Sequence, residues 1–251
     1  MKLSRQFIRA SADMCDFGHP VPAPYFRRAF TLDFLPQIAE ITVCGLGFYE
    51  LTVNGVNITK GPLAPYISNT NDVCYYDHYN VLPYLKQGEN VIGVLLGNGF
   101  RNPFGGFVWD FEKSAQRGPV CLALCLEAKN AARTLTIECD EQFLTHPSPI
   151  LFDDIRMGCH YDARLEIEGW DLPGFDASGW TPAERCPAPK GIARLCDTDS
   201  IVVTKEIEPV SVSYHDKLAF AHVNTSPTAE PQPDTVRENI HVADFGINSA
   251  G

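Results

Sequence analysis

The sequence predicts an all-β protein: a jelly-roll β-sandwich followed by the start of a second β-sandwich. Three observations predict this fold class. Short runs rich in Val, Ile, Phe, Tyr and Thr are separated by clusters of Gly, Pro, Asn and Asp, a pattern typical of antiparallel strands and turns. No long segment places apolar residues at the helical spacing i, i+3, i+4 and i+7. The 251 residues include 19 Gly and 19 Pro, which supply the turns.

The clearest connection between the expected strands is a hairpin at Asn54-Gly55. A type I′ turn needs positive φ at both central residues, which Asn-Gly tolerates, so we interpret Asn54 first as a turn residue. Pro83 lies in a single helical turn, 81–85, where it costs no hydrogen bond. The expected strands are 25–34, 38–44, 47–53, 73–80, 90–97, 120–128 and 134–139.

Two domains are expected, 1–190 and 191–251, because the composition changes to CPAPK at 186–190. In the second domain a strand-like run covers 201–214, and a polar, Pro-rich loop covers 224–240. The last residues, 241–251, resemble the entry to another strand that has no partner. A lone strand cannot satisfy its own backbone groups, so we expect this domain to be incomplete and the polypeptide to continue.

Charge, apolar runs and cysteine content argue against nucleic acid and membrane as partners and indicate the compartment. The formal net charge is −11, from 20 basic and 31 acidic residues, which disfavours nucleic acid. We find no secretory signal and no apolar run near the roughly 20 residues that span a membrane. The nine cysteines, an odd number without a CxxC pair, predict a reducing cytoplasm. Cys121 and Cys125 lie in an apolar strand and are interpreted as buried thiols, not metal ligands.

The loop over 96–112 has the composition of a carbohydrate-binding loop. Sugars pack their C–H patches on aromatic faces, while amide, carboxylate and guanidinium groups bind the hydroxyls. The loop offers both kinds of group and follows an expected strand, where a jelly roll would present a binding loop. Its candidate carbohydrate-binding residues are Asn98, Arg101, Asn102 and Trp109.

The aromatic residues of this loop have an alternative interpretation. Phe107, Trp109 and Phe111 would alternate along a strand and fill the core, which we favour for Phe107 and Phe111 and leave open for Trp109. Glu50 is a fifth candidate, since its carboxylate could accept hydrogen bonds from sugar hydroxyls. The alternative for Glu50 is a solvated position on an edge strand.

A metal site has one weak candidate. Asn69, Asn71 and Asp72 bring oxygen ligands together at a spacing that suits Ca²⁺, but such a run is more typical of a capped turn. We therefore predict no cofactor and no metal, with Ca²⁺ as the alternative.

Acidic pairs suggest no catalytic residues. Asp153 and Asp154 are interpreted as solvated surface charges, and Asp162 as a structural salt-bridge partner of Arg164. The sequence contains no GxSxG, HExxH or phosphate-loop motif, and its seven histidines are dispersed.

Six stretches follow one another in an order typical of a single enzyme family. They are GLGFYEL at 45–51 with NG at 54–55, LAPY at 63–66, VCYYDHYNVLPYL at 73–85, GENVIGVLLGNG at 88–99, YDAR at 161–164 with GW at 169–170 and DASGW at 176–180, and DFG at 244–246 with Asn248 and Gly251. Together they resemble the N-terminal region of bacterial α-L-rhamnosidases of glycoside hydrolase family 78. Phe100 stands where this family usually has Trp, and Cys159 where it often has Glu.

The resemblance implies a galactose-binding-like jelly roll at 1–190 and the beginning of a concanavalin-like β-domain at 191–251. Full-length enzymes of the family cleave terminal α-L-rhamnose by inversion, with two carboxylates in an (α/α)₆ barrel that lies C-terminal to the β-domains. The sequence lacks the helices of that barrel, so the resemblance implies a non-catalytic accessory region that is inactive alone. Its expected partners are a rhamnoside or another carbohydrate and the C-terminal catalytic domain of the same polypeptide. Some rhamnose-binding relatives use Ca²⁺.

Two other functions remain open. The chain could be a stand-alone carbohydrate-binding module, or the sugar-binding domain of a different glycosidase, because GENVIGV at 88–94 also occurs in similar jelly rolls.

Overall fold

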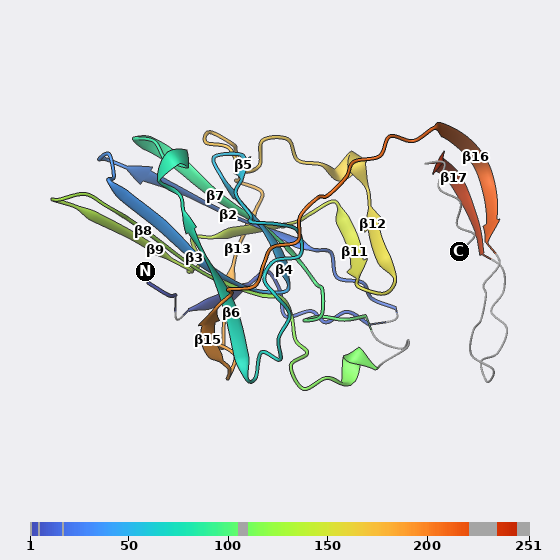
Figure 1. Cartoon of the computed structure of the whole chain (residues 1–251), viewed down its shortest axis with the longest axis horizontal. Helices are drawn as coiled ribbons and strands as arrows, with labels where there is room; N and C mark the ends of the chain where they lie inside the picture. The colour runs from blue at the N-terminus through green and yellow to red at the C-terminus, as the bar shows by residue number, and fades with distance from the viewer. Residues whose placement is uncertain (1, 5, 17, 105–109, 221–234, 245–251) are drawn as a thin grey trace. The chain divides into compact units, whose positions relative to one another are not determined.

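The computed structural model describes residues 2–4, 6–16, 18–104, 110–220 and 235–244, with side chains through residue 211 (Figure 1). The chain divides into two compact units, Met1–Val202 and Val203–Gly251, and each is described by itself. No helix among the described residues is long and apolar enough to cross a membrane.

The first unit is a sandwich of two mainly antiparallel sheets (Figure 1). The seven-stranded sheet has the order β14 (Glu184–Cys186), β1 (Phe7–Arg9), β8 (Cys121–Lys129), β3 (Ile38–Leu46), β6 (Val73–Asn80) and β15 (Ile192–Leu195), and β9 (Thr134–Glu138) pairs with β8. The six-stranded sheet has the order β13 (Thr181–Pro182), β10 (Leu144–Pro147), β2 (Pro24–Leu32), β7 (Gly88–Gly97), β4 (Phe48–Val53) and β5 (Val56–Asn57).

Smaller elements connect the strands. A separate hairpin is formed by β11 (Ile150–Asp154) and β12 (Gly158–Tyr161). The short 3₁₀ helices are η1 (Leu82–Tyr84), η2 (Phe111–Lys113) and η3 (Ala163–Leu165). The predicted all-β sandwich is confirmed, and each of the seven expected strands is present within about two residues of its predicted bounds.

Side-chain alternation along the strands builds the core between the two sheets. In β8, Leu122, Leu124 and Leu126 are fully buried in the main core cluster. Cys121 and Ala123 belong to a second apolar cluster, as expected for residues on the opposite face of the same strand. The predicted burial of the thiols of Cys121 and Cys125 is confirmed.

The Asn54-Gly55 turn has the conformation that its sequence predicts. Asn54 has φ of 52° and Gly55 has φ of 81°, as a type I′ hairpin requires. The Asn54 side chain also donates to Asn90 Oδ1 at 2.9 Å and accepts from the backbone of Val91 at 2.8 Å. The hairpin is therefore tied to the neighbouring strand β7. The helical turn expected at Pro83 is confirmed as η1.

A buried polar network lies inside this sandwich. Tyr49 Oη donates to Asp77 Oδ2 at 2.5 Å and lies 2.9 Å from Tyr79 Oη. Lys60 forms an ion pair with the other oxygen of Asp77 and donates to the carbonyl of Cys196 at 3.1 Å. Burial strongly raises the pKa of Tyr49, so this phenol stays protonated. The network therefore joins β4 and β6 to the segment that leaves β15.

The outer face of the six-stranded sheet is covered by the segment that follows η3. Trp170 stacks on Tyr25 with ring centroids 4.1 Å apart. Arg27 Nε donates to the carbonyl of Trp170 at 2.8 Å, and its guanidinium also binds the carbonyl of Leu172. Gly93 leaves room for this packing, because a Cβ there would lie 2.8 Å from the Trp170 ring. The Gly169-Trp170 motif thus covers part of the outer face of the six-stranded sheet.

The first compact unit extends past the expected boundary at residue 190. β15 pairs in parallel with β6, so that Ile192 is opposite Val73 and Leu195 is opposite Tyr76. The backbone of Cys196 also donates to the carbonyl of Tyr76 at 2.8 Å. These ladder bonds place residues 192–196 in the sheet of the first unit. That unit ends at Val202.

The second unit contains one antiparallel hairpin, β16 (Ser211–Phe220) paired with β17 (Thr235–Asp244). The strand expected over 201–214 begins only at Ser211, which is opposite Asp244 of β17. The loop prediction for 224–240 is wrong for residues 235–240, which pair in β17.

Candidate functional site

The side chains of Asn98 and Asn102, which the sequence predicts to bind carbohydrate, are buried beneath the loop that follows β7. Asn98 is 0% exposed; its amide donates to Asp153 Oδ1 at 2.7 Å and to the carbonyl of Val21 at 2.8 Å. Asn102 is 1% exposed; its amide donates to Asn98 Oδ1 and to the carbonyl of Asp13. Both amide hydrogens of each asparagine are therefore used inside the protein. In this conformation the two side chains support the loop instead of presenting polar groups at a surface.

Two carboxylates on β11 anchor the same loop. Asp153 accepts from the backbone of Asn98 at 2.6 Å and of Gly99 at 3.3 Å, and burial raises the pKa of its carboxyl. Asp154 is 4% exposed and pairs with Arg156. Burial acts to raise the pKa of Asp154, but hydrogen bonds from Arg156 outweigh it and lower the pKa. The interpretation of this acidic pair as solvated surface charge is wrong, because β11 packs against the loop.

Asp162 and Arg164 form the salt bridge that the sequence predicts, although not on a strand. Asp162 caps η3 by accepting from the backbone of Arg164, whose guanidinium binds both carboxylate oxygens. The hydrogen bonds from Arg164 lower the pKa of Asp162 to about 2.

Arg101 is half-buried and also bonded within the protein. Its guanidinium donates to Thr70 Oγ1 at 3.2 Å, to the carbonyl of Pro119 at 3.3 Å and to the carbonyl of Gln116. Arg101 thus joins the loop before β6 to the segment before β8. The Arg101 side chain still lines a pocket, but its guanidinium N–H groups donate to oxygens of the protein itself.

The aromatic part of the predicted loop is described only in part. Trp109 and Phe107 lie outside the described residues, so the carbohydrate-binding role of Trp109 stays a prediction. Phe111 lies in η2 and not on a strand, so the alternating strand predicted for it is wrong. Its ring packs against Phe100 at 5.3 Å and under the guanidinium of Arg156 at 4.8 Å.

Glu50 lies apart from the other candidates. It is exposed on β4, and strand alternation places it on the face opposite the buried Tyr49. Burial is the main cause of the raised pKa of Tyr25, and the carboxylate of Glu50 adds a smaller effect than those of Glu166 and Asp171. Glu50 is therefore free to contact a ligand, but the structure does not bring it together with Arg101.

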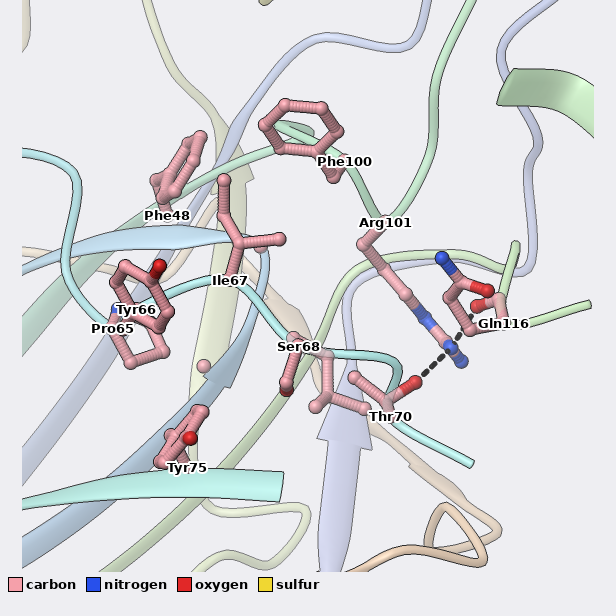
Figure 2. Close-up of a pocket in the computed structure, with 13 residues that line it drawn as sticks. Phe48, Pro65, Tyr66, Ile67, Ser68, Thr70, Tyr75, Phe100, Arg101 and Gln116 are labelled. Atoms are coloured by element: carbon pink, nitrogen blue, oxygen red, sulfur yellow. Dashed lines mark hydrogen bonds between the residues drawn. The ribbon is translucent and has the colours of Figure 1, made fainter. Parts of the chain in front are cut away.

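A shallow pocket of about 50 Å³ lies beside Arg101, between the start of β4 and the loop after β7 (Figure 2). Phe48 and Phe100 meet edge to face on one side, with ring centroids 6.2 Å apart. Tyr66 and Tyr75 meet in the same way on another side, at 6.1 Å. Four aromatic rings therefore line one opening.

The pocket has the chemistry of a neutral, ring-shaped ligand site. Tyr66 is 59% exposed, so a ligand can reach its side chain. Among the described residues, no hydrogen-bond partner reaches the hydroxyls of Tyr66 and Tyr75 or the side-chain amide of Gln116. Flat apolar faces and free polar groups together suit a sugar ring. No carboxylate lines the pocket in the described part of the chain, so it offers no acid–base pair.

Sequence reasoning missed four of these lining residues. Phe48, Tyr66 and Tyr75 lie in the stretches GLGFYEL, LAPY and VCYYDHYN, which carried the family resemblance. The signal that could have found Tyr75 is alternation, because it lies between two buried positions of β6. Gln116 gave no signal, since it lies in an irregular segment.

The turn at 69–72 has the hydrogen bonds of a capped turn. Asn69 Oδ1 accepts from the backbone of Asn71 at 3.1 Å, and its amide donates to Asp72 Oδ2 at 2.7 Å. The turn interpretation is confirmed, and the Ca²⁺ alternative stays a prediction.

Replacing Asn98 with alanine is expected to lower the free energy of unfolding by about 2–3 kcal/mol. The change leaves the buried Asp153 carboxylate and the carbonyl of Val21 short of a donor. Urea unfolding followed by circular dichroism would measure the loss. Asn71→Ala is the matched control, because Asn71 makes its bonds at the surface. Equal stability of the two variants would contradict a supporting role for Asn98.

Comparisons with known proteins agree on one family. The alpha-L-rhamnosidase N-terminal domain model matches residues 36–205. An alpha-L-rhamnosidase of Formosa agariphila is 33% identical over 196 residues, which covers 76% of this chain and 20% of that protein. The alpha-L-rhamnosidase structure from Dictyoglumus thermophilum is 27% identical with a TM-score of 0.68, and covers 83% of this chain and 24% of that one.

A second solved structure, an alpha-L-rhamnosidase from Aspergillus terreus, is 25% identical with a TM-score of 0.69, and covers 86% of this chain and 24% of that chain. The chain thus spans about a quarter or less of the length of these relatives.

Proposed function

Because the chain belongs to the α-L-rhamnosidase N-terminal domain family, we propose that it is the non-catalytic, N-terminal part of an enzyme that hydrolyses terminal α-L-rhamnosides. The similarity to rhamnosidases of which the chain covers only 20% and 24% supports this proposal. The catalytic carboxylates would then belong to a C-terminal domain of the same polypeptide.

The aromatic pocket is proposed as the carbohydrate contact of this region. The observation that carries the proposal is that four aromatic residues, Phe48, Tyr66, Tyr75 and Phe100, line one shallow opening (Figure 2). Free hydroxyls on two of these rings can bind sugar hydroxyls, while the faces pack on sugar C–H groups. A rhamnoside bound there would be oriented by this region and cleaved elsewhere.

Two experiments test the proposal. The 251-residue chain should release no 4-nitrophenol from 4-nitrophenyl α-L-rhamnoside, and turnover by it alone would overturn the non-catalytic role. The reading frame downstream of Gly251 should encode a helical region of several hundred residues with acidic motifs. A stop codon there would favour a stand-alone carbohydrate-binding module.

Sugar titrations separate recognition of rhamnose from recognition of another sugar. L-Rhamnose and D-galactose should be titrated with and without Ca²⁺, and we expect L-rhamnose to bind more tightly. Preference for galactose would favour a domain of another glycosidase. If neither sugar binds at millimolar concentration, the recognition role fails, and a structural role beside the catalytic domain is left.

Replacing Tyr66 with alanine is expected to weaken L-rhamnose binding by about two- to tenfold, because the change removes an exposed aromatic face and a free hydroxyl. Isothermal titration calorimetry would measure the change. Tyr84→Ala is the control, since Tyr84 is an exposed tyrosine on η1 that does not line the pocket. Equal affinities of the two variants would place the sugar elsewhere.

A reducing compartment, the cytoplasm, is proposed as the location. All nine cysteines are free, and eight of them are buried. Thiol titration of the unfolded 251-residue chain, produced in a reducing cytoplasm and taken directly from the cells, should give nine free thiols, and a lower number would contradict the proposal.

A further inference from the structure

A second pocket, separate from the aromatic one, opens on the outer face of the seven-stranded sheet. Its volume is about 220 Å³, which exceeds the roughly 150 Å³ of an engineered cavity that holds benzene. Its floor comes from strands β3, β6 and β8, and its sides come from the N-terminal segment and from β15. The residues that line it are Leu3, Ser4, Phe7, Thr42, Val43, Cys44, Cys74, Tyr76, Ala123, Ala188, Pro189, Gly191 and Ala193.

The lining of this pocket is uncharged and mainly apolar. No Asp, Glu, Lys, Arg or His is among the described residues that line it. Burial raises the pKa of the Cys44 and Cys74 thiols, so both stay neutral. An ion would lose its hydration there without a counter-charge, and a polyol such as a sugar would leave most of its hydroxyls unpaired. The pocket therefore selects against the ligands that suit the aromatic site.

One polar group of the lining is free. Tyr76 is 8% exposed, and its hydroxyl has no hydrogen-bond partner among the described residues. The other polar side chains are already bonded: Thr42 donates to the carbonyl of Lys2, Ser4 to that of Gln6, and Cys74 to that of Thr70. The Tyr76 hydroxyl is not one of the fully buried atoms that lack a partner, so a ligand that supplies one hydrogen-bonding oxygen can reach it.

We propose that this pocket binds one small, uncharged aromatic molecule of one or two rings, with a single oxygen that pairs with the Tyr76 hydroxyl. The rings would pack against Phe7, Ala123 and the Cys44 thiol, which are apolar or weakly polar. Ala193 lies at the side of the pocket on the exposed strand β15.

The test uses 2-naphthol, which has two fused rings and one hydroxyl, titrated into the 251-residue chain and followed by its fluorescence. We expect saturable binding with a Kd below about 1 mM that excess L-rhamnose does not change. The Ala193→Phe change fills the side of the pocket and should weaken binding at least tenfold. Arg194→Phe is the matched control, because alternation along β15 points residue 194 away from the pocket, and its Kd should equal that of the unchanged protein.

A second variant isolates the contribution of the proposed hydrogen bond between the Tyr76 hydroxyl and the ligand. Tyr76→Phe removes one oxygen and keeps the ring, so the fold is retained and binding should weaken about three- to tenfold. Absence of saturable binding by the unchanged protein, or equal Kd values for Ala193→Phe and Arg194→Phe, would overturn the proposal. Neither result affects the carbohydrate proposal, since L-rhamnose is titrated separately against variants of Tyr66.

Discussion

Replacing Asp77 with alanine is expected to lower the free energy of unfolding of the Met1–Val202 unit by about 3–5 kcal/mol. Asp77 is 1% exposed and binds Tyr49 through one carboxylate oxygen and Lys60 through the other. The variant would leave the buried Tyr49 hydroxyl with one partner and the Lys60 ammonium without its counter-charge. Urea unfolding followed by far-ultraviolet circular dichroism would measure the loss.

A double-mutant cycle distinguishes the ion pair from simple loss of packing. Lys60→Met should cost clearly less in the Asp77→Ala background than in the unchanged protein, with a coupling energy of about 1 kcal/mol or more. Asp197→Ala is the control, since Asp197 is exposed and such changes fall within about 0.5 kcal/mol. A loss below about 1 kcal/mol for Asp77→Ala would show that the network contributes little.

Replacing Gly47 with alanine should be similarly severe, with a loss of about 3–5 kcal/mol from backbone strain and overpacking together. Gly47 has φ of 136°, and a Cβ there would lie 2.2 Å from the carbonyl oxygen of Gly97. Gly97 is opposite Phe48 in the ladder between β4 and β7, so its carbonyl cannot move without breaking that pairing. Thermal and urea unfolding of the variant would measure the effect.

A second glycine, Gly174, separates the cost of backbone strain from the cost of overpacking. Gly174 also has positive φ, 82°, but a Cβ there would meet nothing within 4 Å. Gly174→Ala should therefore cost only the strain, about 1–2 kcal/mol. Because Gly47 lines the aromatic pocket, Gly47→Ala should also weaken sugar binding, whereas Gly174→Ala should not. Equal losses of stability would show that the contact with Gly97 relaxes.

The positions of the strands could be predicted from local sequence pattern, because period-two alternation and turn chemistry depend on only a few neighbouring residues. The positive φ of Asn54 and the inward leucines of β8 are examples. Local pattern does not predict that β15 belongs to the sheet, because this strand is short and exposed, with little apolar alternation. Its place in the sheet depends on pairing with Val73–Asn80, far earlier in the chain.

The candidate site was less predictable, since burial of a polar side chain depends on distant segments. Asn98 and Asn102 look like ligand-binding amides in a polar loop, yet their partners are Val21, Asp13 and Asp153. The aromatic pocket likewise combines residues from β4, from the 63–70 loop and from the loop after β7. The sequence predicted aromatic and polar candidates, but only the folded chain shows which side chains share an opening.

The pairing of β1 with β14 has a consequence for synthesis. Arg9 and Glu184, which bond across these strands, are 175 positions apart in sequence. At about 5–20 residues per second, the ribosome needs roughly 10–35 seconds between them. During that interval the first strand lacks one neighbour, and its apolar residues are open to chaperones or to neighbouring nascent chains. The sandwich is closed at this edge only after residue 186 has left the exit tunnel.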